Sequence, residues 1–110
     1  MELDFATSAL RKRMEDERAM SKAYGERAKP LKLRLVLLRQ AKCLADVPHT
    51  PPPRRHRLTG DREGQYAVDL KQPWRLVLEP ANDPLPLLED GGLDLSAVTK
   101  IRIIDVIDYH

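Results

Sequence analysis

Cysteine and long apolar runs are almost missing from this chain of 110 residues. Cys43 is the only cysteine, which excludes an internal disulfide and favours a reducing compartment. We expect Cys43 to be a small buried residue on a helix. No stretch approaches the roughly 18 apolar residues of a membrane span, and no secretory signal pattern opens the chain. We therefore expect a soluble, cytoplasmic protein that does not act at a membrane.

Several common site patterns are also missing. The histidines His49, His56 and His110 are too far apart in the sequence for the short ligand spacings of zinc sites. The two glycines of "GDREG" are not followed by the lysine and serine of a phosphate-binding loop, and no serine lies in a nucleophile-elbow motif. The sequence therefore predicts no metal ion and no cofactor.

Charge is abundant, and it is unevenly distributed. Residues 11–57 contain fourteen Lys or Arg against five Asp or Glu, a net charge of +9. Residues 80–110 contain two basic and six acidic residues, a net charge of −4. A basic first half is typical of proteins with an acidic partner, most often nucleic acid, although a solvated helical face has the same composition.

The order of hydrophobic patterns indicates a single α+β domain over residues 1–110. Two N-terminal helices are expected, one over 9–24 that ends before Gly25 and one that begins near Pro30. The proline-rich stretch "VPHTPPP" connects them to a run of strands. The strands are expected at residues 1–5, 55–58, 66–70, 74–78 and 100–108. This order predicts two helices packed on one face of a small, mainly antiparallel sheet.

Basic groups gather in the sheet half of the chain. Arg54, Arg55, His56 and Arg57 lead into the first hairpin, and Arg62 lies at its tip. Such a cluster suits contacts with phosphate, because arginine presents a planar fork of donors. For His56 alone, a solvated strand residue is the simpler interpretation.

Arg75 lies in the middle of an apolar strand, between Trp74 and Leu76. A charge there is costly unless it has a partner or faces a cleft. Two interpretations stay open: Arg75 lines a site, or it pairs across a hairpin with one of three carboxylates, those of Asp61, Asp69 and Glu79.

The last strand ends on an acid, a phenol and an imidazole, Asp108, Tyr109 and His110. Strict alternation places Tyr109 on one face of the strand. Five residues share the other face: Arg102, Ile104, Val106, Asp108 and His110. Tyr109 and His110 can then serve one site only if the strand bends or frays. Asp108 and the terminal carboxylate favour a protonated His110, which suits an acid. Alone, His110 would be an ordinary tail residue.

These residue types suit RNA cleavage without a metal. That reaction needs a base for the 2′-hydroxyl, an acid for the departing 5′-oxygen, and fixed positive charge around the phosphorane. His56 or His110 can move protons near neutral pH, Tyr109 can donate a proton or stack on a base, and Arg62 and Arg75 can hold phosphate. The assignment of acid and base among these groups stays open.

Three segments taken together resemble one protein family. The segments "HRLTGDREGQYAVDL", "WRLVLEP" and the terminal "IDYH" resemble the HigB-type killer toxins of the RelE/ParE toxin–antitoxin superfamily. The specific likeness covers roughly residues 55–110, and the helices fit only in order and length. The resemblance implies a compact α+β fold of the microbial-ribonuclease kind.

The resemblance also implies a function, a site and partners. It implies the toxin of a type II module, a ribosome-dependent endoribonuclease that cuts mRNA in the decoding site, with Asp108, Tyr109 and His110 as its catalytic tail. Arg75 matches a phosphate-contacting arginine, and His56 falls where a related toxin also has histidine. The implied partners are the ribosome with mRNA and a cognate antitoxin with a helix-turn-helix domain. The toxin would contact operator DNA only through this antitoxin.

Thr59 departs from the family pattern, in which a lysine commonly precedes "G-D-R". That lysine is thought to assist charge and proton transfer, a role that Arg57 or Arg62 would have to fill here. Two alternatives therefore stand beside the nuclease: a ParE-like, gyrase-targeting poison without catalysis, and a degenerate toxin that only binds its antitoxin.

Overall fold

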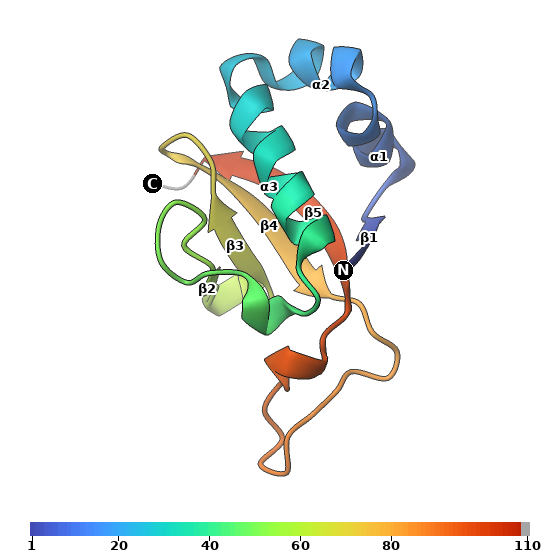
Figure 1. The fold of residues 1–110 in the computed structure, drawn as a ribbon, viewed down its shortest axis with the longest axis vertical. Helices are drawn as coiled ribbons and strands as arrows, with labels where there is room; N and C mark the ends of the chain where they lie inside the picture. Colours follow the sequence, from blue (N-terminus) through green and yellow to red (C-terminus); the bar gives the residue numbers. More distant parts are fainter. Residues whose placement is uncertain (109–110) are drawn as a thin grey trace.

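A computed structural model describes residues 1–108 of the chain. Three α-helices and a five-stranded sheet make up the fold, and the sheet order is β1-β5-β4-β3-β2 (Figure 1). The strands are β1 (Glu2–Phe5), β2 (His56–Arg57), β3 (Tyr66–Asp69), β4 (Trp74–Pro80) and β5 (Lys100–Asp108). Only β1 and β5 pair in parallel, and every other pair is antiparallel. This arrangement confirms the expected α+β fold with a mainly antiparallel sheet.

The segment expected to form one long first helix forms two. Helix α1 (Ser8–Glu15) is capped by the Thr7 hydroxyl, and α2 (Glu17–Tyr24) begins after Asp16. Asp16 has an extended backbone, and its carboxylate accepts a hydrogen bond from the Ala19 amide. An aspartate satisfies the amides at a helix start better than it continues a helix, so the chain turns there.

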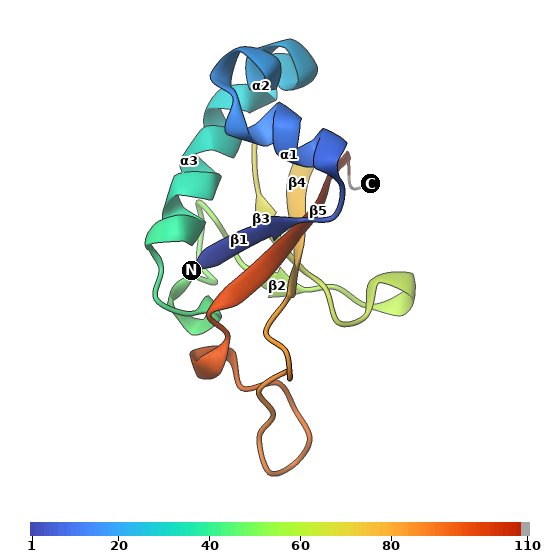
Figure 2. The same cartoon turned by 90° about the vertical axis from the view of Figure 1, so that its right-hand side faces the viewer.

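Helix α3 (Ala28–Gln40) covers one face of the sheet, as Figure 2 shows from the side. Its Leu31, Leu35 and Leu38 are almost fully buried, and they face strand residues such as Leu76 and Ile103 in the same cluster. Each buried leucine contributes about 1.5–3 kcal/mol to the hydrophobic stabilisation. The apolar spacing of 31, 35 and 38 is helical, which explains why this stretch does not form a strand.

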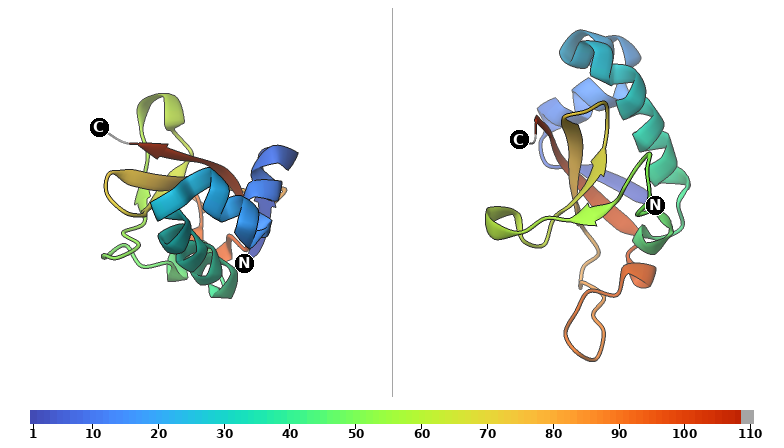
Figure 3. Two further views of the ribbon diagram at one scale, coloured as in Figure 1. Left: turned by 90° about the horizontal axis from the view of Figure 1, so that it is seen from above. Right: turned by 90° about the vertical axis from the view of Figure 1, so that its left-hand side faces the viewer.

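The opposite face of the sheet carries a second, smaller apolar cluster. Leu58, Ala67 and Val77 are buried there, and Ile104 and Ile107 pack against them. We call this side the open face, because among the described residues the helices pack on the other side (Figure 3). The open face is therefore the side on which polar strand residues can reach a ligand.

A β-bulge in β5 corrects the strict alternation expected for the last strand. The register shifts between Val77 and Leu78, so Val77 pairs with Asp105 while Leu78 pairs with Ile103. Val106 consequently belongs to the helix-side core, whereas Ile104 packs on the open face. These two residues do not share a face as predicted, because the extra residue of a bulge changes the phase of the strand.

Two connections also bear on the predictions. Cys43 is partly exposed and precedes the short 3-10 helix Leu44–Asp46, so it does not lie buried on a helix as expected. Residues 82–96 are mostly loop, as expected, and extend from the end of the sheet in Figure 1. A bridge between Leu87 and Leu93 holds this loop together.

Among residues 1–108, no helix is long and apolar enough to cross a membrane.

Candidate functional site

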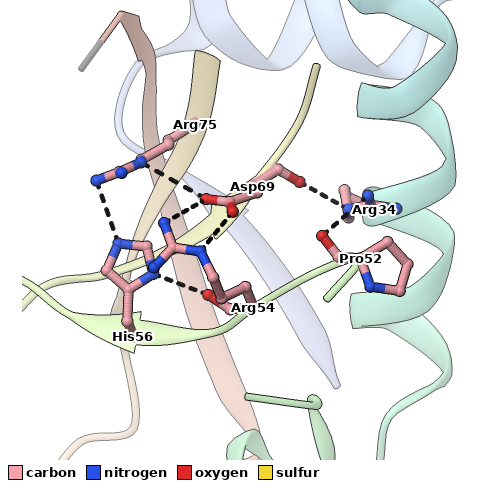
Figure 4. A network of polar contacts seen from close by, with 6 residues as sticks. All are labelled: Arg34, Pro52, Arg54, His56, Asp69 and Arg75. Atoms are coloured by element: carbon pink, nitrogen blue, oxygen red, sulfur yellow. Dashed lines mark hydrogen bonds and ion pairs between the residues drawn. The ribbon is translucent and has the colours of Figure 1, made fainter. Parts of the chain in front are cut away.

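The pairing of β2, β3 and β4 brings three polar side chains together on the open face. Asp69 pairs with Arg75 across β3 and β4, and His56 pairs with Ala67, two residues before Asp69. Paired residues and residues two apart point to the same side of a sheet, so His56, Asp69 and Arg75 share one side. Figure 4 shows these side chains converging.

His56 contacts Arg75 directly. The His56 Nε2 atom lies 3.3 Å from Arg75 Nη1, and His56 Nδ1 lies 2.8 Å from the carbonyl oxygen of Arg54. A guanidinium only donates and a carbonyl only accepts, so these contacts assign the proton to Nδ1 and the lone pair to Nε2. In this arrangement His56 is a neutral imidazole whose accepting nitrogen faces a cation. The interpretation of His56 as merely solvated is therefore wrong, because both ring nitrogens have protein partners.

Asp69 binds two arginines through one carboxylate. Arg54 donates to it through Nε (2.6 Å to Oδ2) and Nη2 (3.0 Å to Oδ1), and Arg75 Nε lies 3.5 Å from Oδ1. Of the three carboxylates considered for Arg75, Asp69 is the partner, while Glu79 pairs with Arg102. The bond to Asp69 is the main reason why the pKa of Arg54 lies above its ordinary value.

A third arginine reaches the same residue from the helix layer. Arg34 of α3 donates through Nε to the backbone oxygen of Asp69 (2.8 Å) and through Nη2 to that of Pro52 (3.3 Å). Burial lowers the pKa of Arg34, and the nearby Asp69 charge partly opposes this effect. Two guanidinium groups thus contact the Asp69 carboxylate and a third binds its backbone oxygen, which leaves the cluster with an excess of positive charge. Such an excess suits an anionic ligand.

The backbone at Arg54 adopts a conformation that non-glycine residues rarely use. Its φ is +46°, and it is the one non-glycine residue with positive φ among residues 1–108. The Arg54 amide donates to the Thr50 carbonyl, and the Asp69 amide donates to the Pro53 carbonyl at 2.7 Å. These bonds tie the proline-rich connector to the end of β3 and hold Arg54 over Asp69. Local strain of this kind is often found at functional sites.

Other predicted site residues lie outside this cluster. Arg55 donates to the Leu44 carbonyl, and Arg62 donates to the Gln65 side chain within the hairpin turn. Arg57 is exposed and lines a separate groove of about 670 Å³ between that turn and the loop at 85–93. Within residues 1–108, the structure thus joins Arg54, His56 and Arg75 of the predicted set.

The predicted catalytic tail is described only in part. Asp108 pairs with Trp74, and its neighbour Ile107 pairs with Arg75, so the end of β5 lies beside the arginine. Tyr109 and His110 lie outside the described residues. The expected meeting of His110 with Arg75 therefore stays a prediction. Within residues 1–108, no group of three or more His, Cys, Asp or Glu side chains is placed to hold a metal ion.

Sequence reasoning named Asp69 only as one of three pairing partners for Arg75, not as a member of the site, and it missed Arg34. Asp69 alternates with Val68 and Leu70, which marks it as facing away from the core, but the sequence does not show that Arg54 also binds it. Arg34 lies on a helix far from β3 in the sequence, and no local pattern connects them.

Comparison with known proteins identifies the fold. No protein-family model and no curated protein sequence matches the chain. Among solved structures, the chain is similar to a YoeB/ParE toxin from Agrobacterium tumefaciens, with a TM-score of 0.57, 14% sequence identity and 100% coverage of both chains. The chain therefore has the α+β fold of a YoeB/ParE toxin over its whole length, as the RelE/ParE resemblance implied.

Proposed function

We propose that this chain is the toxin of a type II toxin–antitoxin module, of the HigB type, and that it cleaves mRNA on the ribosome. The observation that carries the proposal is the contact between His56 and Arg75 on the open face, inside a cluster with excess positive charge. The likeness to a YoeB/ParE toxin supports a toxin, and the predicted tail Asp108–His110 supports the nuclease branch.

In the proposed reaction, each residue has a separate task. The unprotonated Nε2 of His56 removes the proton from the 2′-hydroxyl, whose oxygen attacks the phosphorus. The guanidinium of Arg75 stabilises the charge on the phosphorane, as Arg54 does from the other side of Asp69. The P–O5′ bond breaks, and His110 or Tyr109 gives a proton to the leaving oxygen. The products are a 2′,3′-cyclic phosphate and a 5′-hydroxyl.

Substrate has to replace one contact in this arrangement. At 3.3 Å, the contact between Arg75 and His56 is longer than the usual range of about 2.7–3.2 Å for nitrogen donors, so exchange of partners costs little. When the 2′-hydroxyl takes the place of Arg75 at Nε2, the guanidinium turns toward the phosphate.

Purified protein added to ribosomes programmed with mRNA tests the proposal, with the 5′ ends of the fragments mapped. Wild type cuts within codons, whereas His56→Ala, Arg75→Ala and His110→Ala reduce cleavage by about 100-fold or more. The exposed His49→Ala and Arg13→Ala serve as matched controls and cut like wild type. Equal cutting of naked RNA would contradict ribosome dependence, and no cutting by wild type would contradict the nuclease.

Thr59 gives a specific reason to test the alternatives. It lines the groove beside Arg57 in the position where related toxins have lysine. If wild type cuts no mRNA but blocks DNA supercoiling by gyrase, the non-catalytic poison replaces the nuclease. If it does neither and only binds an antitoxin, the chain is a degenerate toxin. A Thr59→Lys variant that cuts no faster shows that another residue fills the role of that lysine.

We further propose the partners that this function requires. These are the ribosome and an antitoxin with a helix-turn-helix domain that neutralises the toxin and connects it to operator DNA. The module would act in the cytoplasm. Co-expression of this chain with the neighbouring reading frame tests the pairing, because the antitoxin should restore growth and copurify with the toxin.

A further inference from the structure

Asp69 is an unexpected residue in a site for a polyanion. It is the one buried charged residue among residues 1–108, with 6% of its surface exposed. A carboxylate close to a phosphodiester repels it, and burial of an unpaired charge destabilises a fold. Its presence in the cluster therefore calls for a role that outweighs both effects.

The surroundings of Asp69 fix both its backbone and its side chain. The Pro53 carbonyl accepts its amide hydrogen, and Arg34 donates to its carbonyl oxygen. Its carboxylate receives two hydrogen bonds from Arg54 and lies 3.5 Å from Arg75. Contacts from α3, the proline-rich connector and β4 thus converge on one residue, and its position is rigidly defined.

The carboxylate oxygen Oδ1 is shared between two guanidinium groups. It accepts from Arg54 Nη2 at 3.0 Å and lies near Arg75 Nε at 3.5 Å. Two cations this close repel each other unless an anion lies between them. With its Nε side held at Asp69, Arg75 directs Nη1 to His56. The shared oxygen therefore sets the distance between the arginines and the orientation of Arg75.

From this geometry we propose that Asp69 is a positioning residue: it orders the guanidinium groups of Arg54 and Arg75 beside His56 for the transition state of RNA cleavage. The inference rests on the proposed function, which does not assign Asp69. Asp69 touches no reacting atom. It acts through the two arginines, and its buried carboxylate is covered by them, which limits its repulsion of phosphate.

This role predicts opposite effects on binding and on turnover. Asp69→Asn keeps the size of the side chain and removes one negative charge, so the cluster becomes more positive and RNA binds as tightly as before or more tightly. The amide retains one accepting oxygen but carries no charge, so the two arginines lose the anion that holds them together and kcat falls by about 10- to 100-fold. A purely repulsive role for Asp69 would instead raise kcat, and a purely structural role would leave kcat and KM unchanged in the folded protein.

The first experiment needs no cleavage. Nuclear magnetic resonance of the full chain follows the arginine Nε–Hε groups and their exchange with water. Arg54 and Arg75 should exchange at least about tenfold more slowly than the exposed Arg13, and Asp69→Asn should remove this difference. Asp105→Asn is the matched control, because Asp105 is exposed and accepts from the Val106 amide. Unchanged exchange in Asp69→Asn would overturn the positioning role, whether or not the chain is a nuclease.

The second experiment compares KM and kcat on programmed ribosomes. Asp69→Asn should show the lower kcat with an unchanged or lower KM, and Asp105→Asn should behave like wild type. Circular dichroism confirms that each variant is folded, and Asp69→Glu, which retains the charge, should recover part of kcat. A kcat for Asp69→Asn equal to wild type would overturn the inference. Absence of cleavage by every protein, with the exchange result as expected, would contradict only the proposed function.

Discussion

Replacement of Arg54 by alanine or by glycine separates the effect of its charge from that of its backbone strain. Arg54→Ala removes both hydrogen bonds to Asp69, and hydrogen bonds to charged groups contribute about 1.5–3 kcal/mol each. The Arg54 side chain is 36% exposed and Asp69 retains Arg75, so the net loss should be only about 1–2 kcal/mol in total. Alanine at φ +46° also keeps the unfavourable left-handed backbone.

Arg54→Gly loses the same hydrogen bonds but relieves the backbone. Glycine adopts positive φ without a steric penalty, so this variant should be about 1 kcal/mol more stable than Arg54→Ala. For a chain of this size the difference corresponds to about 4 °C in Tm. Urea unfolding followed by circular dichroism measures it. Equal stabilities of the two variants would refute the strain at Arg54, and both variants should cut mRNA more slowly than wild type.

Two further predictions concern the fold. Leu38→Ala, at a fully buried position, should lower the free energy of unfolding by about 3 kcal/mol, whereas the exposed Leu33→Ala should change it by less than about 0.5 kcal/mol in the same urea titration. The pKa of Asp4 lies below its ordinary value, mainly because the Phe5 amide donates to it, with smaller contributions from Arg102 and Arg11. The stability from a lowered pKa is complete above the unfolded pKa and is lost as pH falls through the folded pKa. Asp4→Asn should therefore be less stable than wild type near neutral pH, and the urea midpoints of the two proteins should converge as pH falls below the ordinary pKa of aspartate; a constant gap would contradict this origin.

Local patterns were sufficient to predict most of the strands. The strand expected at 100–108 is found there, because its apolar run is long and follows a polar loop. Asp16 could not be recognised as a break, since its neighbours are all good helix formers. The choice between one helix and two depends on how α1 and α2 pack against other elements, which no local window contains.

The site was predictable only where its residues are neighbours in sequence. Arg54 and His56 were selected from one basic stretch, and Arg75 from its cost in an apolar strand. The carboxylate that joins them was one of three choices, and the register of β3 and β4 decides among them. Arg34 depends on how α3 crosses the sheet, which is a long-range property of the fold.

The bulge in β5 determines which side of the sheet each later residue of the strand faces. Pairing with β1 is complete by Ile103, before the extra residue, so an insertion or deletion at the bulge would leave that pairing unchanged. The residues of β5 after the bulge would exchange sides of the sheet, so Ile107 and Asp108 would each face the side that the other faces now. One extra residue of β5, opposite Val77 and Leu78, therefore determines which sides of the sheet Ile107 and Asp108 face.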